Sequence, residues 1–528
     1  MLAVPNPNKQ VGLLMATAHL GSKTPNVFSS AREQMHAVEE HLRSDAAFAS
    51  DLAELERYIK EEGRELERRL LQAHLDLRAA HERLVDVRGA DGVRRTARRE
   101  SSRVLLTIVG EVIVRRWAYE AKGAQTLHPA DGALNLPADQ YSFGVRRLIA
   151  EEACKGSFDE VVAQTKKILG VTVPKRQVEE LTVRAARDFT AFYATRAVQA
   201  EDTTVLLVFG FNGKGVIMLH EDLREGTKKA AETSQRKLQT RLTRGEKRHR
   251  KRMAQVATIY SIEPWVRTPA DILHDLRSVR DAAARRPRPV NKRVWASLEA
   301  EPKKVIDDAF AEGLRRDPER KRPWVVVVDG NKDQLRQINR AVKHAGVNVT
   351  IILDLIHVLE YFWNAAHCFH KAGTPALEQW VNQRLLALLQ GRTAGALAKD
   401  LRRWAARRAL DKDQQKVVTD GIRYLLNNRK LLHYDRALAA GLPIATGVVE
   451  GACRHLVGDR LDTTGSGWSL PRAEALLRLR ALRSSGDFEA YWAFHLAREH
   501  ARNHGARYAN KQVPGPLWPT EPGRRTVK

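Results

Sequence analysis

Two acidic residues stand where a folded chain can use carboxylates for chemistry. Asp329 directly follows Trp324-Val-Val-Val-Val, a continuously apolar run that predicts a strand buried on both faces of a sheet. A carboxylate at the carboxyl end of such a strand lies where α/β sheets open a ligand crevice, and it can hold a metal ion there. An Asp-Gly turn is an equally good explanation. Glu450 stands one helical turn before Arg454, and this spacing alone favours an i,i+4 ion pair.

A second predicted strand, residues 349–353, ends at Asp354, three residues before His357. Asp354 either adjoins a site or serves only as the N-cap of the helix that follows. Zinc is not predicted on that helix. His357 and Cys368 share a face, but eleven residues at a rise of ~1.5 Å separate them by about 16 Å, too far for one ion.

These side chains need a sheet to position them, and the sequence predicts one that begins near residue 205. Residues 205–209 and 216–218 are apolar segments around Asn212-Gly213, and residues 256–260 supply a third strand. Asn-Gly is the strongest local signal for a two-residue hairpin turn, so Asn212 has a structural explanation. Residues 354–445 are almost wholly helical in pattern and predict a helical insertion of about residues 358–445.

The basic residues indicate a polyanionic partner. The chain has 89 Lys+Arg against 63 Asp+Glu, a net charge of +26. Residues 224–252 contain 12 basic and 3 acidic residues, and residues 285–293 form another basic cluster. Such clusters are often solvated loops, but several in one domain favour neutralisation of DNA phosphates. The predicted contacts in the first cluster are Arg241, Arg244, Lys247, Arg248, Arg250, Lys251 and Arg252.

A helix-turn-helix is predicted upstream of the sheet. One helix spans residues 157–169, Gly170 ends it, and a second helix begins at Pro174 and runs to Phe189. Its exposed start would carry base recognition, through Lys175, Arg176 and Gln177. Plain packing of a helical hairpin is the alternative, and the pattern leaves both open.

The first hundred residues predict helix and hairpin. A heptad-like seam is formed by Ile59, Gly63, Leu66, Leu70, Ala73, Leu77, Ala80 and Leu84. It predicts either a coiled coil between chains or packing on the protein's own next domain. Residues 104–109 and 112–117, separated by Gly110, predict a β-hairpin.

Length and composition complete the expected organisation. A chain of 528 residues predicts about three domains, and the fold class is multidomain α+β. The expected parts are an N-terminal helical region (1–90), a hairpin and helix-turn-helix region (91–200) and a core domain (201–528). No apolar run is long enough to span a membrane, the start lacks a secretory signal, and three cysteines form no CxxC pair. Cytoplasmic localisation is expected.

Across residues 131–496 the sequence resembles a bacterial DDE transposase of the ISKra group, within the Mutator-like transposases. The likeness rests on the element order and on particular motifs. These are Asn135-Leu-Pro137, Tyr141-Ser142, Gly213-Lys-Gly215, the basic residues from Arg224 to Arg252, Asp354-Leu-Ile-His357, Gly447-Val-Val-Glu450-Gly-Ala-Cys-Arg454, and residues 461–468 with Trp492.

The resemblance implies a ribonuclease-H-like core in which three carboxylates hold two divalent cations, usually Mg²⁺, for in-line displacement at phosphorus. Asp329 matches the second catalytic aspartate and Glu450 the glutamate, while Asp354 and His357 match a signature near the site. Arg454 would contact DNA. Trp468 either stacks on an unpaired base or is a buried structural residue. Where relatives carry the first aspartate, this chain has Asn212, which brings no charge to the site.

We therefore expect a transposase that binds its element's terminal inverted repeats and target DNA, as a homo-oligomer near the bacterial nucleoid, with its strand cleavage and transfer in question because of Asn212. One alternative is a catalytically silent DNA-binding protein of transposase ancestry, acting as a repressor or end-binding factor. An RNA-binding protein unrelated to transposases would explain the charge, but not Asp329 and Glu450.

Overall fold

The computed structural model describes residues 27–198, 201–234, 238, 240, 243, 246, 248–276, 286–462, 465 and 467–518. The chain is mixed α/β and forms two compact units. Unit 1 contains residues 1–145, 168–171 and 499–528, and unit 2 contains residues 146–167 and 172–498. In the part of the chain that the structure describes, no helix combines the length and apolar character that crossing a membrane requires.

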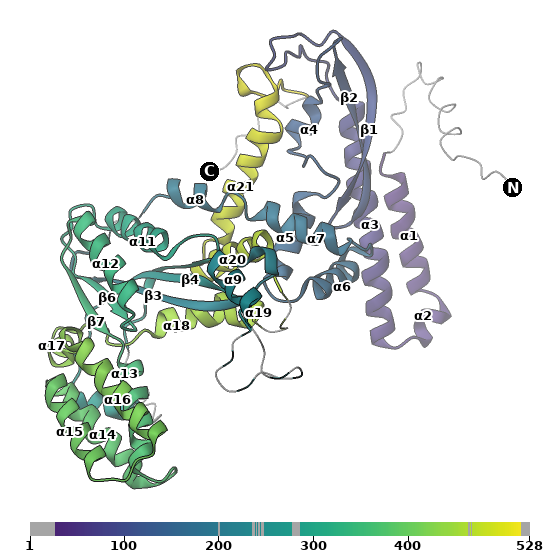
Figure 1. The fold of residues 1–528 in the computed structure, drawn as a ribbon. Helices are drawn as coiled ribbons and strands as arrows, with labels where there is room; N and C mark the ends of the chain where they lie inside the picture. The colour runs from purple at the N-terminus through teal and green to yellow at the C-terminus, as the bar shows by residue number, and fades with distance from the viewer. Residues whose placement is uncertain are drawn as a thin grey trace, which may run out of the picture. The chain divides into compact units, whose positions relative to one another are not determined.

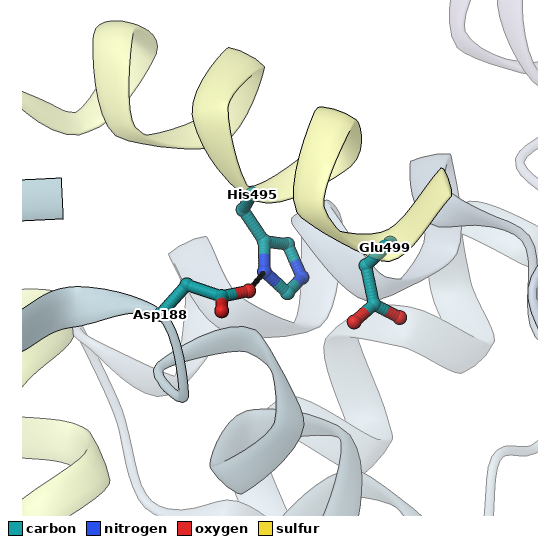
Figure 2. Close-up of side chains that lie close together, drawn as sticks. All are labelled: Asp188, His495 and Glu499. Carbon is teal, nitrogen blue, oxygen red and sulfur yellow. Dashed lines mark hydrogen bonds and ion pairs between the residues drawn. The ribbon is translucent and has the colours of Figure 1, made fainter. Parts of the chain in front are cut away.

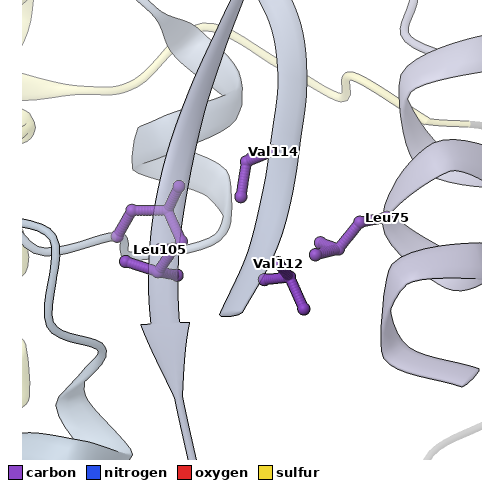
Figure 3. Close-up of a cluster of buried hydrophobic side chains, with 5 residues drawn as sticks. Leu75, Leu105, Val112 and Val114 are labelled. Atoms are coloured by element: carbon purple, nitrogen blue, oxygen red, sulfur yellow. The ribbon is translucent and has the colours of Figure 1, made fainter. Parts of the chain in front are cut away.

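Unit 1 is built on a long helix and a β-hairpin. α3 (Leu52–Ala80) begins at a capping box formed by Asp51 and Glu54. The helix packs on the hairpin of β1 (Ala97–Thr107) and β2 (Gly110–Glu120), where Leu75 joins a buried cluster with Leu105, Val112 and Val114 (Figure 3). The remaining helices are α1 (Ser29–Leu42), α2 (Asp45–Ala49) and α4 (Pro129–Ala133).

The packing of α3 favours one of the two alternatives for the heptad-like seam. Of the eight seam residues, all of which the structure describes, only Ala73 is buried, while Ile59 and Leu70 are 49% and 43% exposed. Leu75, which is not a seam residue, makes the contact with the hairpin. α3 is therefore packed against its own chain, in one core with the hairpin, whereas residues 146–167 and 172–200 belong to unit 2.

Unit 2 contains a mixed five-stranded sheet. Its strands are β3 (Leu206–Ile217), β4 (Lys251–Ile262), β5 (Val290–Ser297), β6 (Trp324–Val328) and β7 (Val349–Leu353). The spatial order is β5-β4-β3-β6-β7. The β3–β4 and β4–β5 pairs are antiparallel, and the β3–β6 and β6–β7 pairs are parallel. β6 is buried at every position, as its continuous apolar run predicts.

The sheet has helices on both faces. α11 (Pro302–Arg316) and α12 (Lys332–Ala345) lie on one face and α18 (Gly447–Ala452) on the other (Figure 1). Phe209 stacks on Phe310 of α11, whereas a Cβ at Gly210 would lie 3.0 Å from Val449 Cβ of α18. Because successive strand residues point to opposite faces, Asn212 points to the same side as Gly210, toward α18.

The predicted hairpin at Asn212-Gly213 is wrong. β3 runs through this dipeptide without a turn and pairs antiparallel with β4 along its whole length, with Asn212 opposite Val256. The two expected segments are thus one strand of 12 residues. The third strand of the antiparallel part is β5, which begins in the segment predicted to be only a basic cluster. Pairing with β4 overrides the local turn preference.

Helices make up most of the remaining chain. In order they are α5 (Phe143–Ala153), α6 (Phe158–Leu169), α7 (Lys175–Ala185), α8 (Phe189–Thr195), α9 (Glu225–Thr233), α10 (Pro269–Leu276), α13 (Leu355–Phe369), α14 (Pro375–Leu389), α15 (Ala394–Ala406), α16 (Lys412–Asn427), α17 (Tyr434–Ala439), α19 (Asp459–Leu461), α20 (Leu470–Ser485) and α21 (Phe488–Asn503). α13 to α17 fill the stretch between β7 and α18, where a helical insertion is predicted. α7 ends at Ala185 rather than Phe189, because the chain turns there and Asp188 binds His495.

Candidate active site

Strand register brings three of the predicted site residues side by side. Gly210 of β3 pairs with Val327 of β6, so Asn212 and Asp329, each two residues further, lie next to each other. Val328 pairs with Leu353 of β7, which places Asp354 beside Asp329 on the other side. In-register neighbours of a sheet point to the same face. Asn212 and Asp329 therefore share the face that α18 covers.

Glu450 reaches these neighbouring strand residues from α18. The missing side chain of Gly210 allows the close approach of Val449, and Glu450 Oε1 then accepts a hydrogen bond of 2.5 Å from Asn212 Nδ2. Arg454 pairs instead with Asp459, at 3.4 Å. The ion pair that the spacing of Glu450 and Arg454 favoured is thus not the reason for Glu450, which faces the sheet.

The hydrogen bonds of Asn212 decide what this site can hold. Its Nδ2 group donates to Glu450, and its Oδ1 atom accepts from the Gly213 amide at 2.6 Å. An N–H group cannot ligate a cation, and the amide adds no negative charge. Asp329 and Glu450 are then the two carboxylates next to Asn212 on the face that α18 covers. Among the described residues, the one group of three converging His, Cys, Asp or Glu ligands lies elsewhere. With Asn212, these residues do not fit a site for two divalent cations.

The loop after β6 is held by the helical insertion. Asp329 Oδ1 accepts from the Asn331 amide at 2.9 Å, and Tyr424 of α16 donates to the Asp329 carbonyl at 2.8 Å. Gly330 has a φ of +89°, and a Cβ there would lie 3.0 Å from the side chain of Asn428. A role of Asp329 in a turn and a role in a site are therefore compatible, because the turn fixes the Asp329 carboxylate. The sequence gives no signal that Tyr424, 95 residues away, does this.

Asp354 is fully buried and ties together three parts of the chain. Its carboxylate accepts from the Ile356 amide at 3.1 Å, from His357 Nδ1 at 2.8 Å, and from both the amide (3.3 Å) and the hydroxyl of Thr446. It is therefore the N-cap of α13, and it also binds the residue that begins α18. The N-cap role is confirmed, although it is not the only role of Asp354, and its place beside an active site stays a prediction.

Asp354 and His357 shift each other's pKa in opposite directions. Burial alone would raise the pKa of Asp354, but hydrogen bonds from His357, Thr446 and the Ile356 amide outweigh burial and hold this pKa below its usual value. The hydrogen bond to Asp354 raises the pKa of His357 against the effect of partial burial, and the negative charges of Glu360 and Asp329 add to the rise.

A pocket of about 480 Å³ opens beside Asn212 and Asp329. Its walls come from β3, β4, α11 and α12, and its polar lining is rich in amides: Gln255, Asn331, Gln334 and Gln337. Lys303 brings one positive charge. Asp354 and Glu450 are not part of this lining, so the pocket extends away from α18.

The residues predicted to contact DNA fall into three groups. Arg241, Arg244 and Lys247 lie outside the described residues. Arg248, Arg250 and Lys251 are exposed at the start of β4. Arg252 donates instead to the carbonyl oxygens of Leu298 (2.7 Å) and Asp222 (2.9 Å), so its guanidinium joins segments of unit 2. Arg252 is therefore explained by structure alone.

At the start of α7, each predicted recognition residue has an acidic neighbour. Lys175 Nζ pairs with Asp159 at 2.8 Å, and Arg176 and Gln177 contact Glu180 at 3.1 and 3.5 Å. The Lys175 and Arg176 side chains are nevertheless 51% and 84% exposed. These surface pairs are weak and leave the side chains accessible.

Trp468 is a structural residue in unit 2. It is buried, its indole N–H donates to the Leu461 carbonyl at 3.1 Å, and its ring packs between Phe158 and the guanidinium of Arg460. Its backbone also continues the sheet, since the Trp468 amide donates to the Ile217 carbonyl. The structure thus favours the buried alternative over stacking on an unpaired base.

A separate buried group is formed by Asp188, which precedes α8, and by two residues of α21. Asp188, His495 and Glu499 place ligand atoms within 4.8 Å of one another and could hold a metal ion (Figure 2). His495 Nδ1 lies 2.8 Å from Asp188 Oδ2, while Glu499 also accepts from Arg502 and from Asn503. This group is not among the sites predicted from the sequence. The i,i+4 spacing of His495 and Glu499 is a local signal, but Asp188 is 307 residues from His495.

Comparisons with known proteins add no assignment to this geometry. No protein-family model matches the sequence, and the search of curated proteins found no match.

Proposed function

We propose that this chain is a transposase-type DNA-binding protein that recognises the ends of a mobile element, and that its strand-cleaving activity is low or absent because of Asn212. One observation carries the proposal: strand register and α18 bring positions 212, 329 and 450 together on one face of a mixed sheet. These are the three positions that the resemblance to DDE transposases assigns to catalysis. The order of three antiparallel strands, α11, β6, α12 and β7 also supports a ribonuclease-H-like core.

The exposed cations beside the site support DNA as the partner. Lys214 follows Asn212 by two residues on β3, and Arg248, Arg250 and Lys251 lie on the antiparallel partner strand or just before it. Lys214 and Lys251 both pair with Asp462, at 3.9 and 3.5 Å. A phosphate backbone laid along this edge would meet positive charge and pass close to Asp329. Joining two element ends would further require at least two copies of the chain on DNA.

A second candidate function is favoured by the hydrogen bond between Asn212 and Glu450. An amide proton shared with the glutamate stabilises the site without a cation. A chain with such a site can still bind element ends and compete with an active transposase. The second candidate is therefore a repressor or end-binding factor.

Cleavage of end-repeat DNA in Mg²⁺ separates the two functions. We expect the wild-type protein to bind this DNA and to nick it weakly or undetectably, and the Asn212→Asp variant to nick it strongly. The Asn212→Asp/Glu450→Gln double variant controls for contaminating nuclease. Intact mass must be checked first, because Asn-Gly deamidates spontaneously to aspartate. An inactive, folded Asn212→Asp protein that still binds the ends would establish the silent function instead.

A further inference from the structure

We infer that Asp354 is a positioning residue for Glu450 and acts through Thr446. The inference rests on the proposed function, because Glu450 has chemistry to perform only in that setting. It assigns to Thr446 a role that the sequence does not indicate, and it makes the contact between β7 and α18 part of the site.

The Asp354 carboxylate divides its hydrogen bonds between its own helix and a distant segment. This side chain is fully buried at the end of β7, where an isolated charge would be costly. Two of its hydrogen bonds stay local, to the Ile356 amide and His357. The other two cross 92 residues of sequence to the amide and hydroxyl of Thr446. Two of the four hydrogen bonds of Asp354 therefore hold Thr446.

A backbone hydrogen bond connects Thr446 to Glu450. Thr446 is the N-cap of α18, and its carbonyl accepts from the Glu450 amide at 2.9 Å. A further backbone bond, from the Leu355 amide to the Ile444 carbonyl (2.9 Å), holds the preceding residues to the end of β7. The first turn of α18 is thus fixed at the same end of the parallel strands that carries Asp329.

α18 continues directly into a π-helical turn, Cys453–Gly458, and contacts the sheet near its own start. Val449 packs against Gly210, an apolar contact that does not set the direction of Glu450, and the hydrogen bond from Asn212 to Glu450 is lost when residue 212 is aspartate. A directional restraint is needed, because a carboxylate that reaches a shared ligand must be held within about 0.5 Å of its working position. The bonds from Thr446 to Asp354 supply that direction.

The test compares Thr446→Val with Thr446→Ser. Both are made in the Asn212→Asp protein, where three carboxylates meet, and Mn²⁺ affinity is measured from the electron paramagnetic resonance signal of free Mn²⁺. Valine keeps the shape of threonine but loses the hydroxyl, whereas serine keeps it. We expect valine to weaken Mn²⁺ binding about tenfold, as loss of a partner behind a ligand does, and serine to leave it within about twofold. Asp354→Asn should act in the direction of valine.

The matched control is Thr165→Val. Thr165 is also buried, but its hydroxyl bonds within α6. This variant should leave Mn²⁺ affinity unchanged, and all variants must show the same cooperative thermal unfolding. Equal affinity of the valine and serine variants at position 446 would overturn the inference while leaving the proposed function intact.

Hydrogen exchange decides the inference even if Asn212→Asp binds no Mn²⁺, a result that would count against the proposed carboxylate site itself. Exchange of the amides of residues 447–452 is followed by mass spectrometry in both position-446 variants with native Asn212. Faster exchange with valine than with serine, confined to these residues and absent in Thr165→Val, is the expected result. Identical exchange in the two variants would refute the positioning role.

Discussion

Asn212 replaces a charge by a hydrogen-bond donor at the centre of the candidate site. Its amide proton lies between position 212 and Glu450, where an aspartate would instead place two carboxylates in contact. Two such groups repel each other unless a proton or a cation lies between them. The substitution therefore changes how the folded state responds to divalent cations, in addition to any effect on catalysis.

This difference predicts a metal-linked change in stability. In the presence of a chelator, Asn212→Asp should be less stable than wild type by about 1 kcal/mol, because it loses the bond to Glu450 and gains repulsion. Mn²⁺ at about 100 times its dissociation constant should then stabilise the variant by about 2.7 kcal/mol, and wild type much less. Urea unfolding with chelator and with Mn²⁺ measures both values. Equal stabilisation of the two proteins would show that Asn212 does not impair cation binding.

His357 predicts a pH dependence of stability that belongs to the same sheet edge. Its pKa is raised in the folded state by Asp354, so its stabilising effect is complete below the unfolded value of about 6.5 and is lost as pH rises through the folded pKa. Asp354 has a lowered pKa, so its contribution is lost only in acid. Urea unfolding between about pH 5.5 and 8.5 should show wild type losing stability toward high pH. His357→Asn should flatten this trend, whereas replacing the exposed His74 should not.

At the scale of elements, local sequence predicted β6, β7 and the helical stretch of α13 to α17, because continuous apolar runs and helical periodicity are local signals. The same signals placed Asp329 at a strand end. Asn212-Gly213 failed as a turn because β4 supplies pairing partners along all of β3, a non-local effect. The contacts that fix the site, from Tyr424 to Asp329 and from Thr446 to Asp354, each span more than 90 residues. Residue types alone carry no signal of such pairs.

Arg293 in β5 is a basic residue that stabilises the fold from within. This guanidinium is buried in β5, lies 2.7 Å from Glu312, and packs on the rings of Tyr193 and Trp295. Burial lowers its pKa against the attraction of Glu312. Arg293→Ala removes this ring packing and one partner of Glu312, which keeps Arg315 and Arg316, and should destabilise unit 2 by about 1–3 kcal/mol.

Exposed Arg288, five residues earlier in the same segment, is the matched control for Arg293. Arg288→Ala should change the free energy of unfolding by less than about 0.5 kcal/mol. Urea unfolding of the two variants gives the comparison. Similar small effects at both positions would mean that β5 is not held through this ion pair.

For the whole molecule, a net charge of +26 attracts DNA from any direction, but only cations that touch phosphates release counterions. Many of the arginines are occupied within the protein, as Arg252 and Arg293 are, so total charge overstates the binding surface. The exposed residues Arg248, Arg250 and Lys251 at the start of β4 lead directly to the site edge. They are the described cations that the proposed function most needs.

Neutralising these three residues together should lower the salt dependence of DNA binding. On duplex DNA each lost phosphate contact reduces the slope of log K against log salt by about 0.9, so the triple alanine variant should lose about 2.7. The control removes the same charge from exposed positions on α16, through Lys412→Ala, Lys416→Ala and Arg423→Ala. Affinity for end-repeat and random duplexes is measured from about 50 to 200 mM salt. If both triple variants reduce the slope equally, binding follows net charge alone, and the cations at the start of β4 are not where this protein holds DNA.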